Sequence, residues 1–223
     1  MNFCLFDIDG TLMVTGGAGQ AAMEAALESE FNATKPIEGI STAGRTDRAI
    51  TTDMFGFHGI ADAPENWQRF QATYFRQLPH ALSSCDGVVF PGVRELLDRL
   101  AARDDVVLGL LTGNYRAGAE LKLAHYELDH HFDFGGFGDV HHHRDDVARE
   151  ALAEARSRHG DVDLNRVWVI GDTPADVTCA RAINAKVVAV GTGIHPNEEV
   201  TAAEPDQFFE DLADTQVFVD LLD

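Results

Sequence analysis

The sequence predicts an α/β fold: a parallel sheet with helices on both faces and a helical insertion after the first strand. Four apolar runs have the length of buried strands and alternate with helical stretches, at residues 3–6, 106–111, 167–170 and 187–190. Such alternation is typical of parallel sheets that are buried on both faces. No strong strand pattern occurs between residues 14 and 85, and this gap predicts the insertion.

The insertion, residues 14–85, is expected to form a helical cap domain on a core made of residues 1–13 and 86–223. Apolar side chains recur at helical spacing in residues 20–31 and 65–78. The glycine cluster at residues 16–19 would suit a flexible hinge into the cap, and an ordinary loop explains it equally well. The cluster lacks the full spacing of a dinucleotide-binding fingerprint.

The first predicted strand ends in Asp7-Ile8-Asp9-Gly10-Thr11, the most informative segment of the chain. Residues two apart in an extended chain point to the same side, so Asp7 and Asp9 are expected to face one site. Two anions this close require a cation between them or a proton on one of them, and both arrangements suit phosphate chemistry. Gly10 permits a tight turn, and Thr11 can hydrogen-bond back to that turn. A plain loop that ends the strand is the alternative.

The second strand, residues 106–111, runs into Thr112-Gly113-Asn114. The Thr112 hydroxyl and the main-chain N–H groups of Gly113 and Asn114 can donate to phosphate oxygens. Arg144 follows later in the chain and can bind phosphate through two parallel hydrogen bonds.

The third strand, residues 167–170, runs into Gly171-Asp172-Thr173-Pro174-Ala175-Asp176 at an expected helix start. Asp172 and Asp176 add two carboxylates at the same edge of the sheet, where ligands bind in folds of this kind. Hard oxygen ligands on loops favour Mg²⁺. The sequence therefore predicts a magnesium site beside the first aspartate pair.

In this order the segments resemble the haloacid dehalogenase superfamily, whose members are mostly phosphatases that work through an aspartyl-phosphate. The DxDGT at residues 7–11 and the GDTxxD at residues 171–176 are its most specific motifs. The resemblance spans essentially the whole chain and implies a three-layer Rossmann-like core with a helical cap. It points to the capped branch that includes phosphoglycolate phosphatases.

The resemblance implies a role for each matching residue. Asp7 would be the nucleophile, and Asp9 the general acid and then the general base. Mg²⁺ would be bound by Asp7, Asp172 and the main-chain carbonyl of Asp9, with Asp176 orienting this metal group. The remaining residues would bind the phosphoryl group or shape its site: Gly10, Thr112, Gly113, Asn114 and Arg144.

The third motif departs from the family pattern, in which a lysine is usual. Arg144 lies where the family places this cation, ahead of the helix that leads to residue 167. Lys122 is the rival, although it follows Thr112 by only ten residues on an expected helix.

Within the cap, Gly44-Arg45-Thr46-Asp47-Arg48 places two guanidinium groups near an expected helix start. Arg45 is the candidate specificity residue, suited to a carboxylate or phosphate on the substrate. A solvated helix terminus with local ion pairs explains the segment as well.

The expected reaction is hydrolysis of a small-molecule phosphomonoester. A proton donor at Asp9 favours phosphoryl transfer over carbon–halogen cleavage, because a halide leaving group needs no proton. A phosphotransferase or phosphomutase would use the same donor and stays an alternative. A non-catalytic phospho-acceptor domain is another, although the insertion makes this chain longer than one compact receiver domain.

The composition restricts the partners and the compartment. The formal net charge of −20 over 223 residues argues against binding to nucleic acid or to an anionic membrane surface. A first strand that starts at residue 3 and an odd, scattered set of three cysteines predict a cytoplasmic protein with reduced thiols. The histidines at 130–131 and 141–143 are interpreted as solvated turns rather than as a zinc site, because consecutive residues cannot all face one ion.

Overall fold

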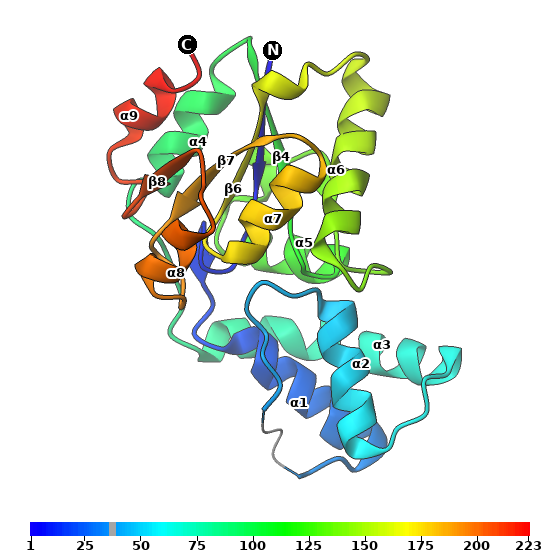
Figure 1. The fold of residues 1–223 in the computed structure, drawn as a ribbon. Coiled ribbons are helices and arrows are strands. Elements are labelled where there is room, and N and C mark those ends of the chain that lie inside the picture. Colours follow the sequence, from blue (N-terminus) through cyan, green and yellow to red (C-terminus); the bar gives the residue numbers. More distant parts are fainter. Residues whose placement is uncertain (36–38) are drawn as a thin grey trace.

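The structure, a computed structural model, describes residues 1–35 and 39–223 and has the predicted α/β architecture (Figure 1). Its main sheet has six parallel strands in the order β5-β4-β1-β6-β7-β8. The strands are β1 (Asn2–Phe6), β4 (Val106–Leu111), β5 (Gly135–Gly136), β6 (Val167–Gly171), β7 (Lys186–Val190) and β8 (Gln207–Phe209). The four predicted strands are all present, each within one residue at either end. The outer strands β5 and β8 were not predicted.

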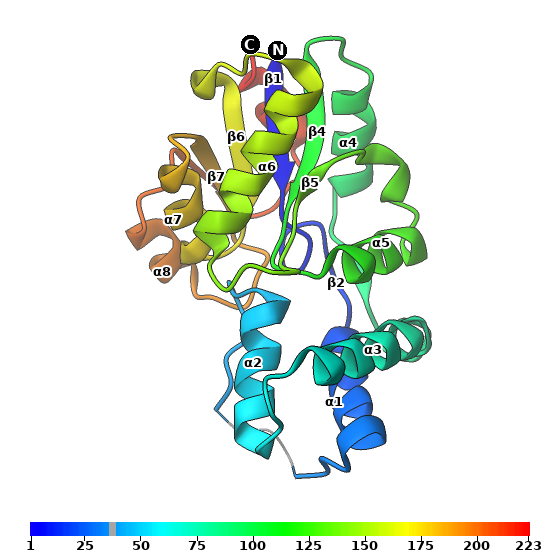
Figure 2. The same cartoon turned by 90° about the vertical axis from the view of Figure 1, so that its right-hand side faces the viewer.

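Helices cover both faces of this sheet (Figures 1 and 2). One face carries α4 (Val93–Ala101), α5 (Arg116–His125) and α9 (Thr215–Asp220), and the other carries α6 (Arg144–His159) and α7 (Pro174–Ala182). Strand β1 shows why both faces are needed. Phe3 and Leu5 pack against α6 and α7, whereas Cys4 and Phe6 pack into the cluster on the opposite face. A strand that is apolar at every position from Phe3 to Phe6 requires cover on both sides.

The insertion after β1 consists of three helices that lie below the core in Figure 1: α1 (Ala18–Phe31), α2 (Asp47–His58) and α3 (Pro64–Ser84). They bury an aromatic cluster of their own that includes Phe55, Trp67, Phe70 and Tyr74. The ring centroids of Phe55 and Trp67 lie 4.7 Å apart. Tyr115 of the core packs into the same cluster, so the insertion and the core share apolar contacts.

The two chain passages between core and insertion run side by side. They form a short antiparallel ribbon of β2 (Met13–Val14) and β3 (Val88–Val89), in which Met13 lies opposite Val89. Gly16 follows with a φ of +61°, and a Cβ there would lie 2.8 Å from the main chain of Asp86. Glycine is therefore required where the two passages come closest.

Three short elements complete the description: η1 (Asp129–His131), η2 (Leu164–Arg166) and α8 (Asn197–Ala202). Across the ranges 1–35 and 39–223, no helix combines the length and the apolar character that a bilayer crossing requires.

Candidate active site

The strand register brings the predicted site residues to one edge of the sheet. Phe6, the last residue of β1, lies opposite Leu110 of β4 and Ile170 of β6. The chain therefore leaves these three neighbouring strands at nearly the same level, at the carboxyl edge where ligands bind in parallel sheets. The buried residues that follow are Asp7, Thr112 and Asp172.

Arg144 pairs with two of the predicted carboxylates. Its Nη2 lies 3.1 Å from Asp7 Oδ2, and the same nitrogen donates to Asp176 Oδ1. The side chain is only 5% exposed, so its charge is compensated by these carboxylates rather than by water. Within the described residues the buried Arg144 Nε has no hydrogen-bond partner. This placement favours Arg144 as the cation beside the predicted nucleophile.

Three buried carboxylates and one guanidinium leave this site with excess negative charge. Burial raises the pKa of Asp7 to about 6, although Arg144 opposes the shift. Burial, assisted by the charges of Asp176 and Asp7, raises the pKa of Asp172 to about 8. Ligand oxygens of the three aspartates all lie within 4.8 Å of one another. Buried carboxylate oxygens at this spacing fit a divalent cation such as Mg²⁺, which would supply the missing positive charge.

Protein donors already occupy both carboxylate oxygens of Asp176. Oδ1 accepts from Arg144, and Oδ2 accepts from the main-chain N–H of Thr173 at 3.0 Å and from its hydroxyl at 2.7 Å. The Thr173 hydroxyl in turn caps the start of α7. This arrangement fits the expected role of Asp176 in orienting the metal group better than direct binding of the ion.

The loops after β1 and β7 enclose Asp172. Thr11 donates its hydroxyl to Asp172 Oδ1 at 2.9 Å, so it holds this carboxylate rather than the turn to which the sequence assigned it. A Cβ at Gly10, where φ is +87°, would lie 2.3 Å from Asp172 Oδ2, and one at Gly193 would lie 1.9 Å from that oxygen. Gly193 was missed by the sequence analysis, although the Gly-Thr-Gly at 191–193 follows a predicted strand and is the kind of signal that marks a site loop.

Asp9 belongs to a second hydrogen-bonded group, with Asn114 and Lys122. Lys122 Nζ donates to Asp9 Oδ2 at 2.5 Å and to Asn114 Oδ1 at 2.7 Å. Asn114 Nδ2 donates to the same Asp9 oxygen at 2.9 Å and to Thr112 Oγ1 at 2.8 Å. The ammonium group is buried, whereas the Asp9 side chain is 41% exposed. Lys122, the rival for the third motif, therefore binds the predicted general acid.

Gly113 lies where the cap touches the core. Its carbonyl accepts the main-chain N–H of Asp47 at 2.7 Å, and Asp47 Oδ2 accepts the main-chain N–H of Tyr115 at 2.8 Å. A Cβ at Gly113 would lie 2.0 Å from the carbonyl oxygen of Arg45. The sequence analysis also missed Asp47, because an acidic residue at the start of a helix indicates only the N-terminus of that helix.

A cavity of about 350 Å³ opens between the core and the cap. Core residues Asp7 and Asp9 line one side of it, and cap residues Met23, Ile50 and Met54 line the other. The walls therefore combine a charged end with an apolar end, as in most small-molecule sites.

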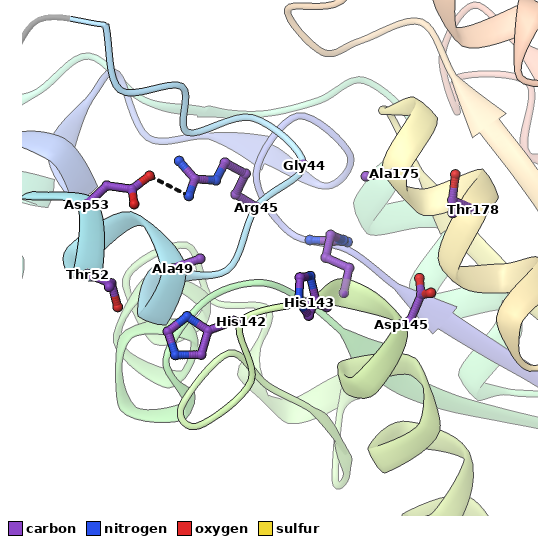
Figure 3. Close-up of a pocket in the computed structure, with 11 residues that line it drawn as sticks. Gly44, Arg45, Ala49, Thr52, Asp53, His142, His143, Asp145, Ala175 and Thr178 are labelled. Carbon is purple, nitrogen blue, oxygen red and sulfur yellow. Dashed lines mark hydrogen bonds and ion pairs between the residues drawn. The ribbon is translucent and has the colours of Figure 1, made fainter.

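Arg45 borders this cavity and also a wider outer groove of about 680 Å³ (Figure 3). In the groove Arg45 Nη2 pairs with Asp53 at 2.7 Å, and Nη1 donates to the Ser41 carbonyl at 3.1 Å. The guanidinium group is thus partnered by two cap residues.

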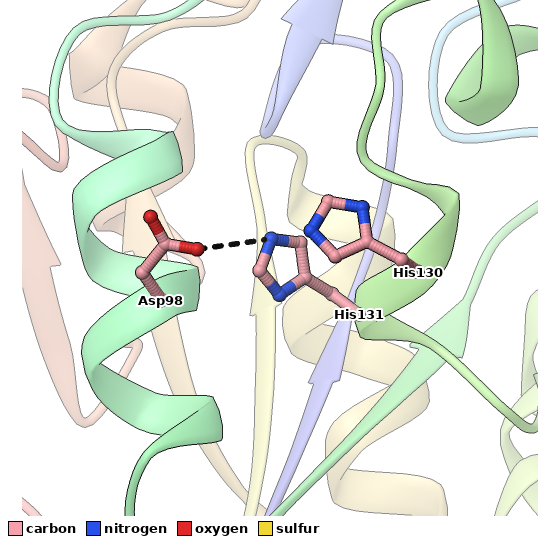
Figure 4. Close-up of side chains that lie close together, drawn as sticks. All are labelled: Asp98, His130 and His131. Carbon is pink, nitrogen blue, oxygen red and sulfur yellow. Dashed lines mark ion pairs between the residues drawn. The ribbon is translucent and has the colours of Figure 1, made fainter.

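The described residues offer one further group with metal-ligand chemistry, Asp98, His130 and His131 (Figure 4). His131 Nε2 lies 3.5 Å from Asp98 Oδ1, and the two imidazole rings are 4.0 Å apart. This group lies at the amino end of β4, since its two histidines line a groove with Val106. It is therefore at the opposite end of the sheet from Asp7. In the other histidine segment, His141 pairs with Glu150, and His142 and His143 line the outer groove.

Comparisons with known proteins identify the family of this chain. The model of the family described as haloacid dehalogenase-like hydrolase matches residues 4–190. A phosphoglycolate phosphatase from Synechococcus elongatus is 31% identical over 150 residues, which cover 66% of this chain and 67% of the relative. The "Probable phosphatase IndB" of Dickeya dadantii is 29% identical over 208 residues, which cover 90% of this chain and 86% of the relative.

A solved structure of a hydrolase from Pseudomonas syringae has the same fold, with a TM-score of 0.74 at 21% identity over 100% of this chain and 99% of the other. The predicted fold class, with its helical insertion after β1, is confirmed, and so is the expected enzyme class. Since the family model spans most of the sequence, this chain belongs to the haloacid dehalogenase-like hydrolases.

Proposed function

We propose that the protein is a Mg²⁺-dependent phosphatase that hydrolyses a small-molecule phosphomonoester through an aspartyl-phosphate on Asp7. One observation carries this proposal: Asp7 is buried beside Arg144, within a carboxylate group spaced for a divalent cation, at the wall of a cavity that suits a small metabolite. The names of the relatives from Synechococcus and Dickeya support a phosphate ester as the substrate.

In the first proposed step, a carboxylate oxygen of Asp7 attacks phosphorus and the bond to the leaving oxygen breaks. The Ile8 N–H holds Asp7 Oδ1 at 2.8 Å, so the carboxylate is already oriented for attack. The Arg144 guanidinium and the main-chain N–H of Gly113, both from residues that line the cavity, would stabilise the phosphoryl oxygens. Asp9 would donate its proton to the leaving oxygen.

In the second proposed step, Asp9 takes a proton from water as the water oxygen attacks phosphorus. The bond between phosphorus and the Asp7 oxygen breaks, which restores the Asp7 carboxylate and releases inorganic phosphate. A bound Mg²⁺ would offset the repulsion between the Asp7 carboxylate and the phosphate anion. Asp7, Asp172 and the main-chain carbonyl of Asp9 would hold the ion, and Asp176 would keep the group oriented.

The cap, with the boundaries proposed from the sequence at residues 14 and 85, would exclude water and select the substrate. Arg45 is its proposed specificity residue. To bind an anionic group on the substrate, Arg45 must exchange its partner Asp53 for that group. Arg45→Ala is then expected to raise KM with little loss of kcat, and an unchanged KM for the preferred substrate would discard this role.

A phosphate-release screen over small phosphomonoesters, with and without Mg²⁺, tests the proposed function. Release is expected to depend on Mg²⁺ and to disappear in Asp7→Asn. Asp104→Asn, a change in the exposed turn before β4, serves as the control and is expected to keep its turnover number. Full activity in Asp7→Asn contradicts the mechanism, EDTA-resistant turnover contradicts the metal, and phosphate retained on a sugar phosphate indicates a mutase instead.

A further inference from the structure

Lys122 is a buried cation for which the proposed phosphoryl transfer has no use. Its side chain is only 6% exposed, and a buried ammonium is tolerated only when anions and acceptors surround it. Its Nζ lies 2.5 Å from Asp9 Oδ2, so a carboxylate compensates its charge. Lys122 therefore stays a cation between the predicted general acid and the cap.

The hydrogen bonds in this group select one oxygen of Asp9. Lys122 Nζ and Asn114 Nδ2 both donate to Oδ2, at 2.5 and 2.9 Å. Among the hydrogen bonds of residues 1–35 and 39–223, none reaches Oδ1. The Asp9 carboxylate is thus held by one oxygen, and the other remains available to a ligand in the cavity that Asp9 lines.

Lys122 also sets the orientation of Asn114. By donating to Asn114 Oδ1 at 2.7 Å, it requires the amide nitrogen to point the other way, toward Asp9 and Thr112. The cap holds the same loop, because Asp47 bonds to the main chain of residues 113 and 115 on either side of Asn114. The three-way contact of Asp9, Asn114 and Lys122 is therefore fixed from both the core and the cap.

From these contacts we infer that Lys122 is a positioning residue, which holds Asp9 by Oδ2 and so presents Oδ1 for proton transfer to the leaving oxygen. The inference rests on the proposed role of Asp9 as general acid. In the first step the O–H bond at Asp9 Oδ1 breaks, the proton goes to the leaving oxygen, and the electron pair stays on the carboxylate. The ammonium of Lys122 stabilises the negative charge that forms there.

The choice of leaving group separates this role from phosphate binding or simple structural support. Glycerol 2-phosphate releases an alkoxide, which needs a proton, whereas p-nitrophenyl phosphate releases a phenolate, which does not. The quantity to measure is kcat/KM, since it covers only the steps up to departure of the leaving group. Substitution of a residue that acts through the general acid should lower kcat/KM for the alkyl ester selectively.

Lys122→Met is expected to lower kcat/KM on the order of 10- to 100-fold for glycerol 2-phosphate and less than about 3-fold for p-nitrophenyl phosphate, since general acid catalysis supplies ~10²–10⁴-fold. Asp9→Asn should show the same selectivity, and adding Lys122→Met to it should cause no further selective loss. Lys122→Arg, which keeps the charge and the donors, should restore part of the alkyl activity.

Lys186→Met is the matched control, because Lys186 lies on β7 with its ammonium 4.6 Å from the Trp168 ring centroid. It should leave both kcat/KM values unchanged. Equal losses on the two esters in Lys122→Met, or a further selective loss in the Asp9→Asn background, would overturn the inference. Asp7→Asn tests the proposed function separately, because it should abolish turnover of both esters whatever Lys122 does.

Discussion

Asp47 offers a direct test of the contact between cap and core. This carboxyl is 8% exposed, and its Oδ2 accepts the Tyr115 N–H at 2.8 Å. Burial raises the pKa of Asp47 to about 6; Lys122 and the Tyr115 N–H oppose the rise, and the charges of Asp9 and Asp139 add to it. In the unfolded chain the pKa of an aspartate is about 3.9. The folded protein therefore binds this proton more tightly, and its stability falls as the pH rises from about 4 through 6.

The size of this effect follows from the two pKa values. At about 1.4 kcal/mol per pH unit, the interval from about 3.9 to about 6 costs the folded state about 3 kcal/mol at pH 7. Asp47→Asn removes the charge and keeps an oxygen for the Tyr115 N–H. The new amide N–H₂ needs an acceptor of its own, so a net gain of about 1–2 kcal/mol in unfolding free energy is expected at pH 7.

Urea unfolding of the wild type and Asp47→Asn between about pH 4 and pH 7 measures this gain. The variant should be more stable at pH 7, and its advantage should shrink toward pH 4. Asp53→Asn makes the same charge change at an exposed position of α2 and should shift stability by less than about 0.5 kcal/mol. An Asp47→Asn protein that is less stable at pH 7, or whose advantage does not vary with pH, would refute this reasoning.

Three further predictions concern the site and the thiols. Arg144→Met should leave its two buried carboxylate partners unpaired, which should lower the unfolding free energy by about 3 kcal/mol. The rate of phosphate release should fall by more than ~100-fold. Wild-type values in urea unfolding and steady-state assays would contradict this prediction. Gly193→Ala should displace Asp172 and raise the Mg²⁺ concentration for half-maximal activity by at least ~10-fold, with an unchanged Mg²⁺ titration as the opposing result. Burial raises the pKa of the Cys4 and Cys179 thiols to about 12. Iodoacetamide near pH 8 should therefore label only Cys85 in the native protein, as peptide mass spectrometry would reveal.

The sheet was predictable wherever a strand carries its own apolar pattern. Strands β1, β4, β6 and β7 consist mostly of apolar residues, and their bounds could be read from the sequence to within one residue. Strand β5 is Gly135–Gly136, which has no side-chain pattern and is a strand only because Leu110 and Leu111 pair with it. Strand β8 is three residues at the sheet edge, too short for a period to appear.

The site divides in the same way. Asp7, Asp9, Asp172 and Asp176 stand in short motifs at strand ends, so local sequence was enough to select them. The partners of Lys122 could not be inferred from the sequence, since Asp9 is 113 residues away and the contact depends on how α5 packs. Geometry likewise places Arg144 beside Asp7, the proposed nucleophile, and Lys122 beside Asp9, the proposed general acid, a choice that spacing alone left open.

The proposed reaction requires a covalent bond between phosphorus and Asp7, and one measurement detects that bond directly. The protein would be quenched in acid during turnover of p-nitrophenyl phosphate with Mg²⁺, digested, and mapped by mass spectrometry. One phosphoryl group is expected on the peptide that contains residues 3–11, located on Asp7, and none is expected on the same peptide of Asp7→Asn. A phosphoryl group on any other residue, or none in an enzyme that is turning over, would contradict the proposed reaction.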